Sequence, residues 1–185
     1  MRKLVVMCVV VCLFAGLSSM AWAQWNQDDG AGPYVTAGYF MPEQNNYDDG
    51  WEIGAVALPS AYNPDGWRWG LFVSFFDTAG YGTGETMVPA GDQIQVNIDG
   101  GYVYQLGGEN GRNDSYIGAG VTLVSGSWDG PQGSVEDTAL GFHIVAGTRA
   151  SENFLIEIEW TDAQYGDSFA NEEAGGLVVR GGIEF

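Results

Sequence analysis

The sequence has few basic side chains and almost no cysteine. Only 6 of its 185 residues are Lys or Arg, against 24 Asp and Glu, and the formal net charge is −18. Such a surface would repel phosphate backbones and anionic headgroups, so we expect no nucleic-acid partner and no docking through a basic patch. The two cysteines, Cys8 and Cys12, both lie in the first 23 residues. The rest of the chain therefore has no thiol for a disulfide or for nucleophilic chemistry.

After residue 24 the sequence has no apolar run long enough for a transmembrane helix. The N-terminus does have a short one, where Arg2 and Lys3 precede VVMCVVVCLFAGL and Ala21-Trp22-Ala23 follows. A basic start, a short apolar core and an A-x-A site are typical of a secretory signal peptide. We therefore predict a cleaved signal peptide at 1–23 and one domain at 24–185.

The remaining sequence alternates apolar and polar residues in segments that are separated by clusters of Gly, Asn, Asp and Pro. Alternation predicts strands with one apolar and one polar face, and 14% aromatic and 45% hydrophobic residues argue against disorder. The connections after the third, fifth and seventh predicted strands are longer than those after the second, fourth and sixth, which is typical of outer-membrane barrels. The eight expected strands are 33–41, 51–58, 67–77, 92–105, 115–125, 138–149, 154–161 and 176–185.

The predicted fold is all-β: an eight-stranded, antiparallel, up-and-down transmembrane β-barrel. Its apolar face would contact lipid, and its polar, glycine-rich face would fill a narrow interior. Aromatic side chains near the strand ends are expected to form girdles at the two membrane interfaces, among them Trp51, Trp67, Trp69 and Trp160. A secreted lipocalin-like barrel or a β-sandwich would show the same alternation with the two faces exchanged, and it stays an alternative.

Two segments near the C-terminus carry a family resemblance. GFHIVAGTRASENFLIEIEW has glycines at Gly141 and Gly147, a Ser-x-Asn turn, and a returning strand with inward glutamates. The last strand alternates through Val179 and Ile183 to a terminal Phe185. Together with the eight-strand pattern, these segments resemble the OmpA-like and opacity-type small outer-membrane β-barrels, reduced to the barrel domain.

The resemblance implies a location in the bacterial outer membrane and contact with the lipid bilayer and lipopolysaccharide. It also implies a non-enzymatic role, either structural or through surface loops. The outer-membrane assembly machinery is expected to read a C-terminal signal that includes Phe185, Ile183 and Val179. An OmpW-type narrow conduit for small apolar solutes is a second interpretation.

Motifs for chemistry are missing from the sequence. It has no phosphate loop, metal-ligand spacing or nucleophile motif, so we predict no catalytic residue, no cofactor and no metal. A lipid-modifying enzyme is a third interpretation, because outer-membrane lipid A deacylases are similar in size. Their histidine is followed two residues later by a serine, where this sequence has Val145 after His143. His143 is therefore expected to point into a hydrogen-bonded lumen.

Charged residues on the polar face predict an ion pair inside the barrel. Pairing of the last two strands places Glu159 opposite Arg180, or Glu157 after a shift of two residues. Buried charges are costly unless they are paired, so we expect either a rigid plug or a gate in a small pore. Arg68 is expected at the rim opposite the acidic loops.

The predicted long loops are acidic, with Asp129, Glu136, Asp162 and Glu173 among their residues. None of them has the ligand order of a tight calcium loop. A solvated surface is one interpretation of these charges. Weak binding of divalent cations that bridge to lipopolysaccharide phosphates is the other.

Overall fold

The computed structural model describes residues 33–43, 47–59, 65–78, 90–106, 115–130, 133–151, 153–166 and 173–184. The predicted signal peptide and Phe185 lie outside these residues. None of the described segments forms a helix that is long and apolar enough to cross a membrane.

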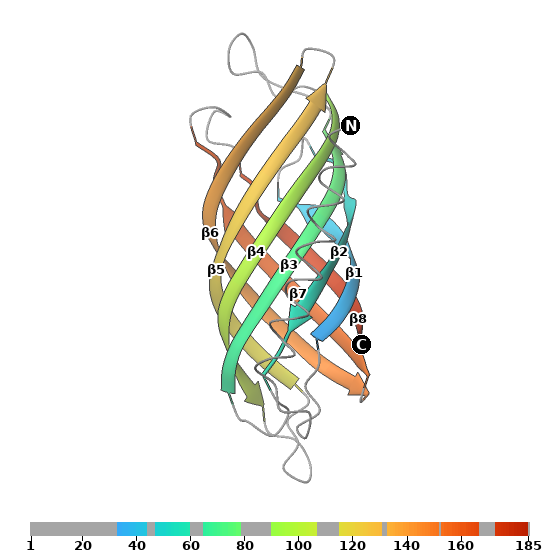
Figure 1. Cartoon of the computed structure of the whole chain (residues 1–185), viewed down its shortest axis with the longest axis vertical. Helices are drawn as coiled ribbons and strands as arrows, with labels where there is room; N and C mark the ends of the chain where they lie inside the picture. The colour runs from blue at the N-terminus through green and yellow to red at the C-terminus, as the bar shows by residue number, and fades with distance from the viewer. Residues whose placement is uncertain are drawn as a thin grey trace.

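The described part of the chain forms eight antiparallel strands that close into a barrel (Figure 1). Each strand pairs with the next and β1 pairs with β8, so the topology is up-and-down, as the sequence predicts. The pair Tyr34–Glu184 lies at the rim where β1 begins and β8 ends. We call it the terminal rim, and the opposite one the distal rim. The strands are β1 (Pro33–Pro42), β2 (Gly50–Ala57), β3 (Asp65–Thr78), β4 (Gly91–Leu106), β5 (Ser115–Gly130), β6 (Gly133–Ser151), β7 (Phe154–Ala163) and β8 (Gly176–Glu184).

The two faces of the strands carry different side chains, as the alternation predicts. In β7, Ile156 and Ile158 are 43% and 45% exposed, whereas Glu157 between them is fully buried. Large apolar side chains are exposed on all eight strands. Leu71 and Val73 of β3 share this outer face by register and are nonetheless buried. The outside of the barrel is thus an apolar belt, because neighbouring strands present the same face to the surroundings.

One wall of the barrel has longer strands than the other. β3, β4, β5 and β6 have 14, 16, 16 and 19 residues, whereas the other four strands have 8 to 10. The prediction of a long loop after the fifth strand is wrong, because the β5–β6 ladder continues to the pair Gly130–Gly133. Asp129 and Glu136, expected in that loop, therefore lie on strands. Figure 1 shows this hairpin extending beyond the other strands at the distal rim.

Glycines on the inner face make room for one aromatic ring. Phe72 of β3 is fully buried in the interior. A Cβ atom at Gly54 would lie 2.2 Å from this ring, and one at Gly70 would lie 2.4 Å from it. Both distances are far inside van der Waals contact, so both positions require glycine. Their lack of side chains allows the narrow interior of an eight-stranded barrel to hold a large ring.

Candidate functional site

The inner side chains form layers along the barrel axis. Apolar residues that include Tyr34, Val56 and Leu155 cluster toward the terminal rim. Other apolar clusters, around Trp128 and around Phe40, lie toward the distal rim. Between them is a group that we call the charged layer, whose six residues are each at most 2% exposed: Glu52, Arg68, Asp99, Glu157, Glu159 and Arg180.

Arg180 of β8 contacts three carboxylates. Strand pairing sets it opposite Glu157, which is the second of the two registers expected from the sequence. Its Nη2 atom lies 3.2 Å from Glu159 Oε1, and its Nη1 atom lies 3.8 Å from Glu157 Oε2. Its Nε atom lies 3.2 Å from Glu52 Oε1 on β2. Arg180 therefore joins the β7–β8 hairpin to a strand that does not neighbour it.

Arg68 of β3 is the second cation of the charged layer. Its Nε and Nη2 atoms donate hydrogen bonds of 2.9 Å and 3.1 Å to the two carboxylate oxygens of Glu157. Nη2 also donates a 2.7 Å hydrogen bond to Glu159, and Nη1 lies 3.8 Å from Asp99. The expectation of Arg68 at the rim is wrong, because the side chain is fully buried among these carboxylates.

Neutral groups complete the surroundings of the carboxylates. The Tyr116 hydroxyl donates a hydrogen bond to Glu157, and the Ser74 hydroxyl donates one of 3.1 Å to Glu52. The guanidinium carbon of Arg180 lies 3.7 Å from the centroid of the Phe72 ring, a cation–π geometry. Counting Tyr116 on β5, the charged layer and its hydrogen-bond donors tie six strands together across the lumen.

Sequence reasoning missed Arg68, Glu52 and Asp99 as parts of this site. The pair Arg68–Glu157 is 89 residues apart in sequence, so hairpin pairing alone does not reveal it. The sequence does contain a sign of their position, because each of the three is a charged residue at an inward-facing position of an alternating strand. When the barrel closes, inward-facing side chains of strands that are distant in sequence meet across its axis.

His143 of β6 is fully buried on the inner face. Neither of its ring nitrogens has a hydrogen-bond partner among the described residues, in contrast to the hydrogen-bonded lumen expected for it. Val145, two residues further along, lies in the apolar cluster near the terminal rim. The histidine therefore has no hydroxyl nucleophile at the position where the deacylase arrangement would supply one.

Aromatic packing closes the lumen toward the distal rim. The Trp128 and Tyr165 rings meet edge to face with centroids 5.0 Å apart, and the Tyr165 hydroxyl donates a 3.4 Å hydrogen bond to Gln95. Burial raises the pKa of the Tyr165 hydroxyl, so it stays a neutral donor. The gap that these rings share with Phe40 and Phe76 has no room for a water molecule.

The residues predicted for the outer face lie there. Trp51, Trp67 and Trp69 are 68%, 60% and 54% exposed, and Trp160 is half-buried. In β8, Val179 and Ile183 are 43% and 63% exposed, while Phe185, the last residue of the predicted assembly signal, lies outside the described residues. These positions are consistent with a membrane-facing surface, and the role of the last strand in assembly stays a prediction.

Acidic side chains gather at the distal rim. Loss of hydration and repulsion from Glu173 and Asp162 raise the pKa of Glu43. No three acidic or histidine side chains in the described segments come together in a way that could hold a metal ion. Weak cation binding at the outer loops therefore stays a prediction.

No protein-family model matches the sequence, and a comparison with curated proteins gives no match. One similar solved structure is that of Ail, the attachment invasion locus protein of Yersinia pestis, in complex with the heparin analogue sucrose octasulfate. Its sequence is 15% identical to this one, and the match covers 84% of this chain and 99% of Ail with a TM-score of 0.48. Neisserial surface protein A is 15% identical over 83% of this chain and 95% of its own, also with a TM-score of 0.48.

Proposed function

We propose that this chain is a bacterial outer-membrane β-barrel with a closed interior, which serves the cell envelope structurally or through its distal surface. One observation carries the proposal: charges are buried inside and apolar side chains are exposed outside. Leu140, Trp51 and Ile183 are 72%, 68% and 63% exposed on three different strands. Water would make such a belt an aggregation surface, whereas lipid covers it favourably.

The soluble alternatives require the opposite arrangement. A lipocalin-like barrel or a β-sandwich buries its apolar faces and turns its polar faces to water. Here Glu157 and Arg180 face inward, and Ile158 and Val179 beside them face outward. This orientation supports the membrane barrel and gives the soluble alternatives no support.

Orientation and export follow from the proposal. Outer-membrane barrels have their short turns on the periplasmic side, so the terminal rim would be periplasmic and the distal rim would face outward. The predicted signal peptide at 1–23 would direct export and then be removed. Acidic residues at the distal rim, such as Glu43, Asp162 and Glu173, would then lie on the cell surface.

Fractionation of cells tests the location. The mature protein should appear with the outer membranes, need detergent for extraction, and migrate differently on a gel before and after heating. The heat-dependent mobility is expected because a closed hydrogen-bonded barrel unfolds only on heating. Recovery as a soluble periplasmic or secreted monomer would contradict the proposal.

The packed interior supports a plug rather than a conduit. Two arginines and four carboxylates fill the described charged layer, and aromatic packing closes the lumen between this layer and the distal rim. Planar-bilayer recordings of the wild type should show no conductance. If Arg180→Met produces frequent openings, the layer is a gate, and the OmpW-type conduit gains support instead.

The proposed role is non-enzymatic. The buried His143 has no serine two residues later, and its nitrogens make no hydrogen bond with a hydroxyl among the described residues. Incubation with lipid A or phospholipid should therefore release no fatty acid. Release by the wild type that is lost in His143→Ala would identify the lipid-modifying alternative.

We further propose that the outer-membrane assembly machinery reads Val179, Ile183 and Phe185, as the family resemblance implies. Deletion of Phe185 should slow insertion and lower the folded yield in cells. Phe185→Tyr is the matched control, since it keeps the ring and should assemble at the wild-type rate. If the deletion also assembles at that rate, the machinery does not read this residue.

The negative charge of the chain limits which partners its surface can bind. This chain has a net charge of −18 and would repel an anionic sugar that approached it directly. We propose lipopolysaccharide as the neighbour at the distal rim, with divalent cations between its phosphates and the acidic side chains. Removing the cations with a chelator should lower lipopolysaccharide co-purification, and Glu173→Gln together with Asp162→Asn should have the same effect.

A further inference from the structure

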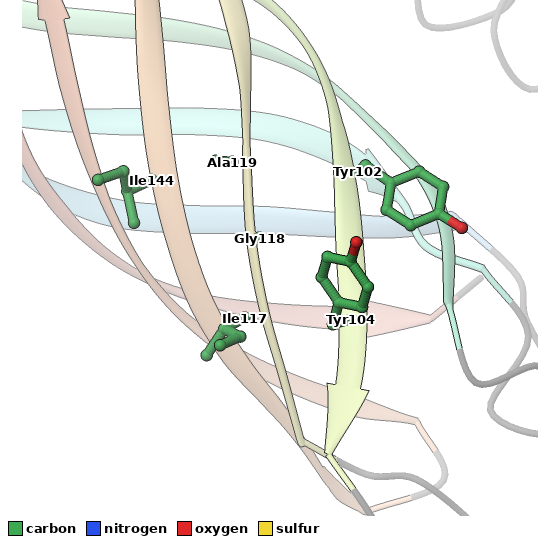
Figure 2. A pocket seen from close by; sticks show the side chains of 6 residues that line it. All are labelled: Tyr102, Tyr104, Ile117, Gly118, Ala119 and Ile144. Carbon is green, nitrogen blue, oxygen red and sulfur yellow. The ribbon is translucent and has the colours of Figure 1, made fainter.

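A shallow groove lies on the outside of the barrel, across β4, β5 and β6 toward the terminal rim (Figure 2). Its volume is about 620 Å³, and the groove is open to the surroundings rather than enclosed. We call it the β4–β6 groove, defined by its six lining residues: Tyr102, Tyr104, Ile117, Gly118, Ala119 and Ile144.

A change in side-chain size produces the groove. Ala119 of β5 pairs with Tyr102 on one side and with Ile144 on the other, so a single methyl group lies between two large side chains. Figure 2 shows Gly118 and Ala119 of β5 between the tyrosines of β4 and Ile144 of β6, with Ile117 further along β5. The floor is therefore small and the walls are apolar.

An aromatic ridge borders the groove on the β3 side. The Trp67 and Trp69 rings are stacked with centroids 6.0 Å apart, and Trp67 meets Tyr102 at 5.7 Å. Tyr102 in turn meets Tyr104 at 5.4 Å. A Cβ atom at Gly100 would lie 2.6 Å from the Trp69 ring, so glycine lets this ring lie close against the sheet. Such a ridge near a barrel rim is typical of the membrane interface, where amphipathic rings lie at headgroup level.

The polar end of the groove carries a carboxylate, and the described residues place no cation there. Asp65, the first residue of β3, is the cross-strand partner of Tyr104 and lies near the Tyr102 hydroxyl. All three arginines in the described segments, Arg68, Arg149 and Arg180, are at most 4% exposed. A phosphate or other anion at this end would therefore find no positive partner on the described surface, whereas an ammonium group would find a carboxylate.

We propose that the β4–β6 groove binds one acyl chain of phosphatidylethanolamine and that the lipid ammonium contacts Asp65 and the Tyr102 hydroxyl. The inference rests on the proposed function, because it takes the apolar belt to be in contact with a bilayer. A second copy of the chain is a poorer match, since a stable protein interface needs roughly 20–30 residues on each side. A lipid needs only the six that line the groove.

Native mass spectrometry of the mature protein in detergent tests the groove. Equal amounts of phosphatidylethanolamine and phosphatidylglycerol with identical acyl chains are added, after unheated gel mobility has shown that each sample is a folded barrel. The wild type should retain phosphatidylethanolamine about two- to fivefold over phosphatidylglycerol, the range expected for one exposed charge pair. Ala119→Phe fills the groove and should lose most of the retained lipid of both kinds. Val179→Phe, an outward change on β8, is the matched control and should behave as wild type.

The headgroup contact is tested separately. Asp65→Asn should remove the preference between the two lipids while keeping the acyl-chain binding, and Asp77→Asn near the distal rim is its control. Equal lipid retention by the wild type and Ala119→Phe overturns the groove, and an unchanged preference in Asp65→Asn overturns the headgroup contact. A dimer peak that Ala119→Phe abolishes assigns the groove to a second copy and overturns the lipid. Failure of the proposed function appears earlier, as the absence of a heat-sensitive barrel band before any lipid is added.

Discussion

Glu157 and Ile158 are neighbours in β7, yet their surroundings are opposite. Glu157 is fully buried and accepts hydrogen bonds from Arg68 and Tyr116. Ile158 is 45% exposed on the apolar belt, where it pairs with Val179 of β8. On the inner face, the residue type is therefore set by particular hydrogen-bond and ion-pair partners. On the outer face, it is set by the surrounding medium. Substitutions on the two faces should fail for different reasons and by different amounts.

The largest effect is expected from removing a cation on the inner face. Arg180→Met leaves Glu52, Glu157 and Glu159 with one cation fewer in a dry interior. Loss of one partner of a buried ion pair costs about 3–5 kcal/mol, and this should appear as a lower free energy of unfolding. Urea titration of the barrel in lipid vesicles measures it.

A double-mutant cycle shows whether the loss comes from the charged layer. Glu159→Gln in the Arg180→Met background should recover part of the lost stability, because it removes one unpaired carboxylate. Recovery is partial, since Glu159 also contacts Arg68. A coupling energy near zero would mean that Arg180 and Glu159 do not interact.

A cation placed on the outer face should have the next largest effect. Ile158 lies in the middle of β7, and Ile158→Lys would place an ammonium group in hydrocarbon at roughly 2–4 kcal/mol. Val35→Lys is the matched control, because Val35 is 49% exposed on the same face but close to the terminal rim. It should cost roughly 0–1 kcal/mol in the same vesicle assay. Equal costs at the two depths would contradict a membrane-spanning belt.

A single hydroxyl gives a finer comparison of the two faces. Ser74 donates a hydrogen bond to the buried Glu52, so Ser74→Ala should lower the free energy of unfolding by about 1.5 kcal/mol. Ser125 accepts a hydrogen bond from Thr138 on the exposed side of the β5–β6 hairpin. Ser125→Ala should stay within about 0.5 kcal/mol of the wild type. If both changes lower the free energy of unfolding equally, the inner hydrogen bond contributes no more to stability than the exposed one.

The smallest effect concerns pH at the distal rim. The pKa of Glu43 is raised by loss of hydration and then by Glu173 and Asp162, so its ionised form is disfavoured in the folded barrel. The raised value means that this penalty is present at neutral pH and disappears as pH falls through the pKa. Glu43→Gln should therefore be slightly more stable than wild type at pH 7, by about 0.3 kcal/mol, and equal to it at low pH.

Urea titrations at neutral and acidic pH measure this difference. Glu136→Gln makes the same change in charge on an exposed residue of β6 and serves as control, because Glu136 lies beyond the β6–β7 ladder, which begins at the pair Gly141–Ala163. A Glu43→Gln variant that gains stability only at low pH would reverse the expected sign and exclude repulsion at the rim.

Strand number and facing could be predicted from the sequence because lipid requires apolar residues at alternate positions. The same reason explains the error at β5 and β6. Beyond the belt the outer face meets water, and residues such as Ser125, Ser127 and Thr138 interrupt the apolar alternation although the backbone ladder continues. The pattern therefore reports the extent of the membrane-facing part of a strand and not the whole of its length.

The site was predictable only where it depends on one hairpin. Pairing of β7 with β8 brings Glu157 to Arg180, and the sequence limits that register to two choices. The contacts of Arg68 with Glu157 and Glu159 depend on barrel closure and diameter, which set the distances across the lumen. Local alternation does not encode these distances, and this is why a rim position was expected for Arg68.

The unequal strand lengths give the molecule a slanted outline at its distal end. The β5–β6 hairpin rises on one wall, whereas β1 and β2, with 10 and 8 residues, end lower on the other. Among the described strands, the raised wall is the part that a large approaching body, such as another cell or a phage tail, would reach first. Sequence insertions between β5 and β6 would then lie at the highest point of the described strands, and equal insertions between β1 and β2 would lie lower. Variation selected at the surface should therefore concentrate on one side of the barrel.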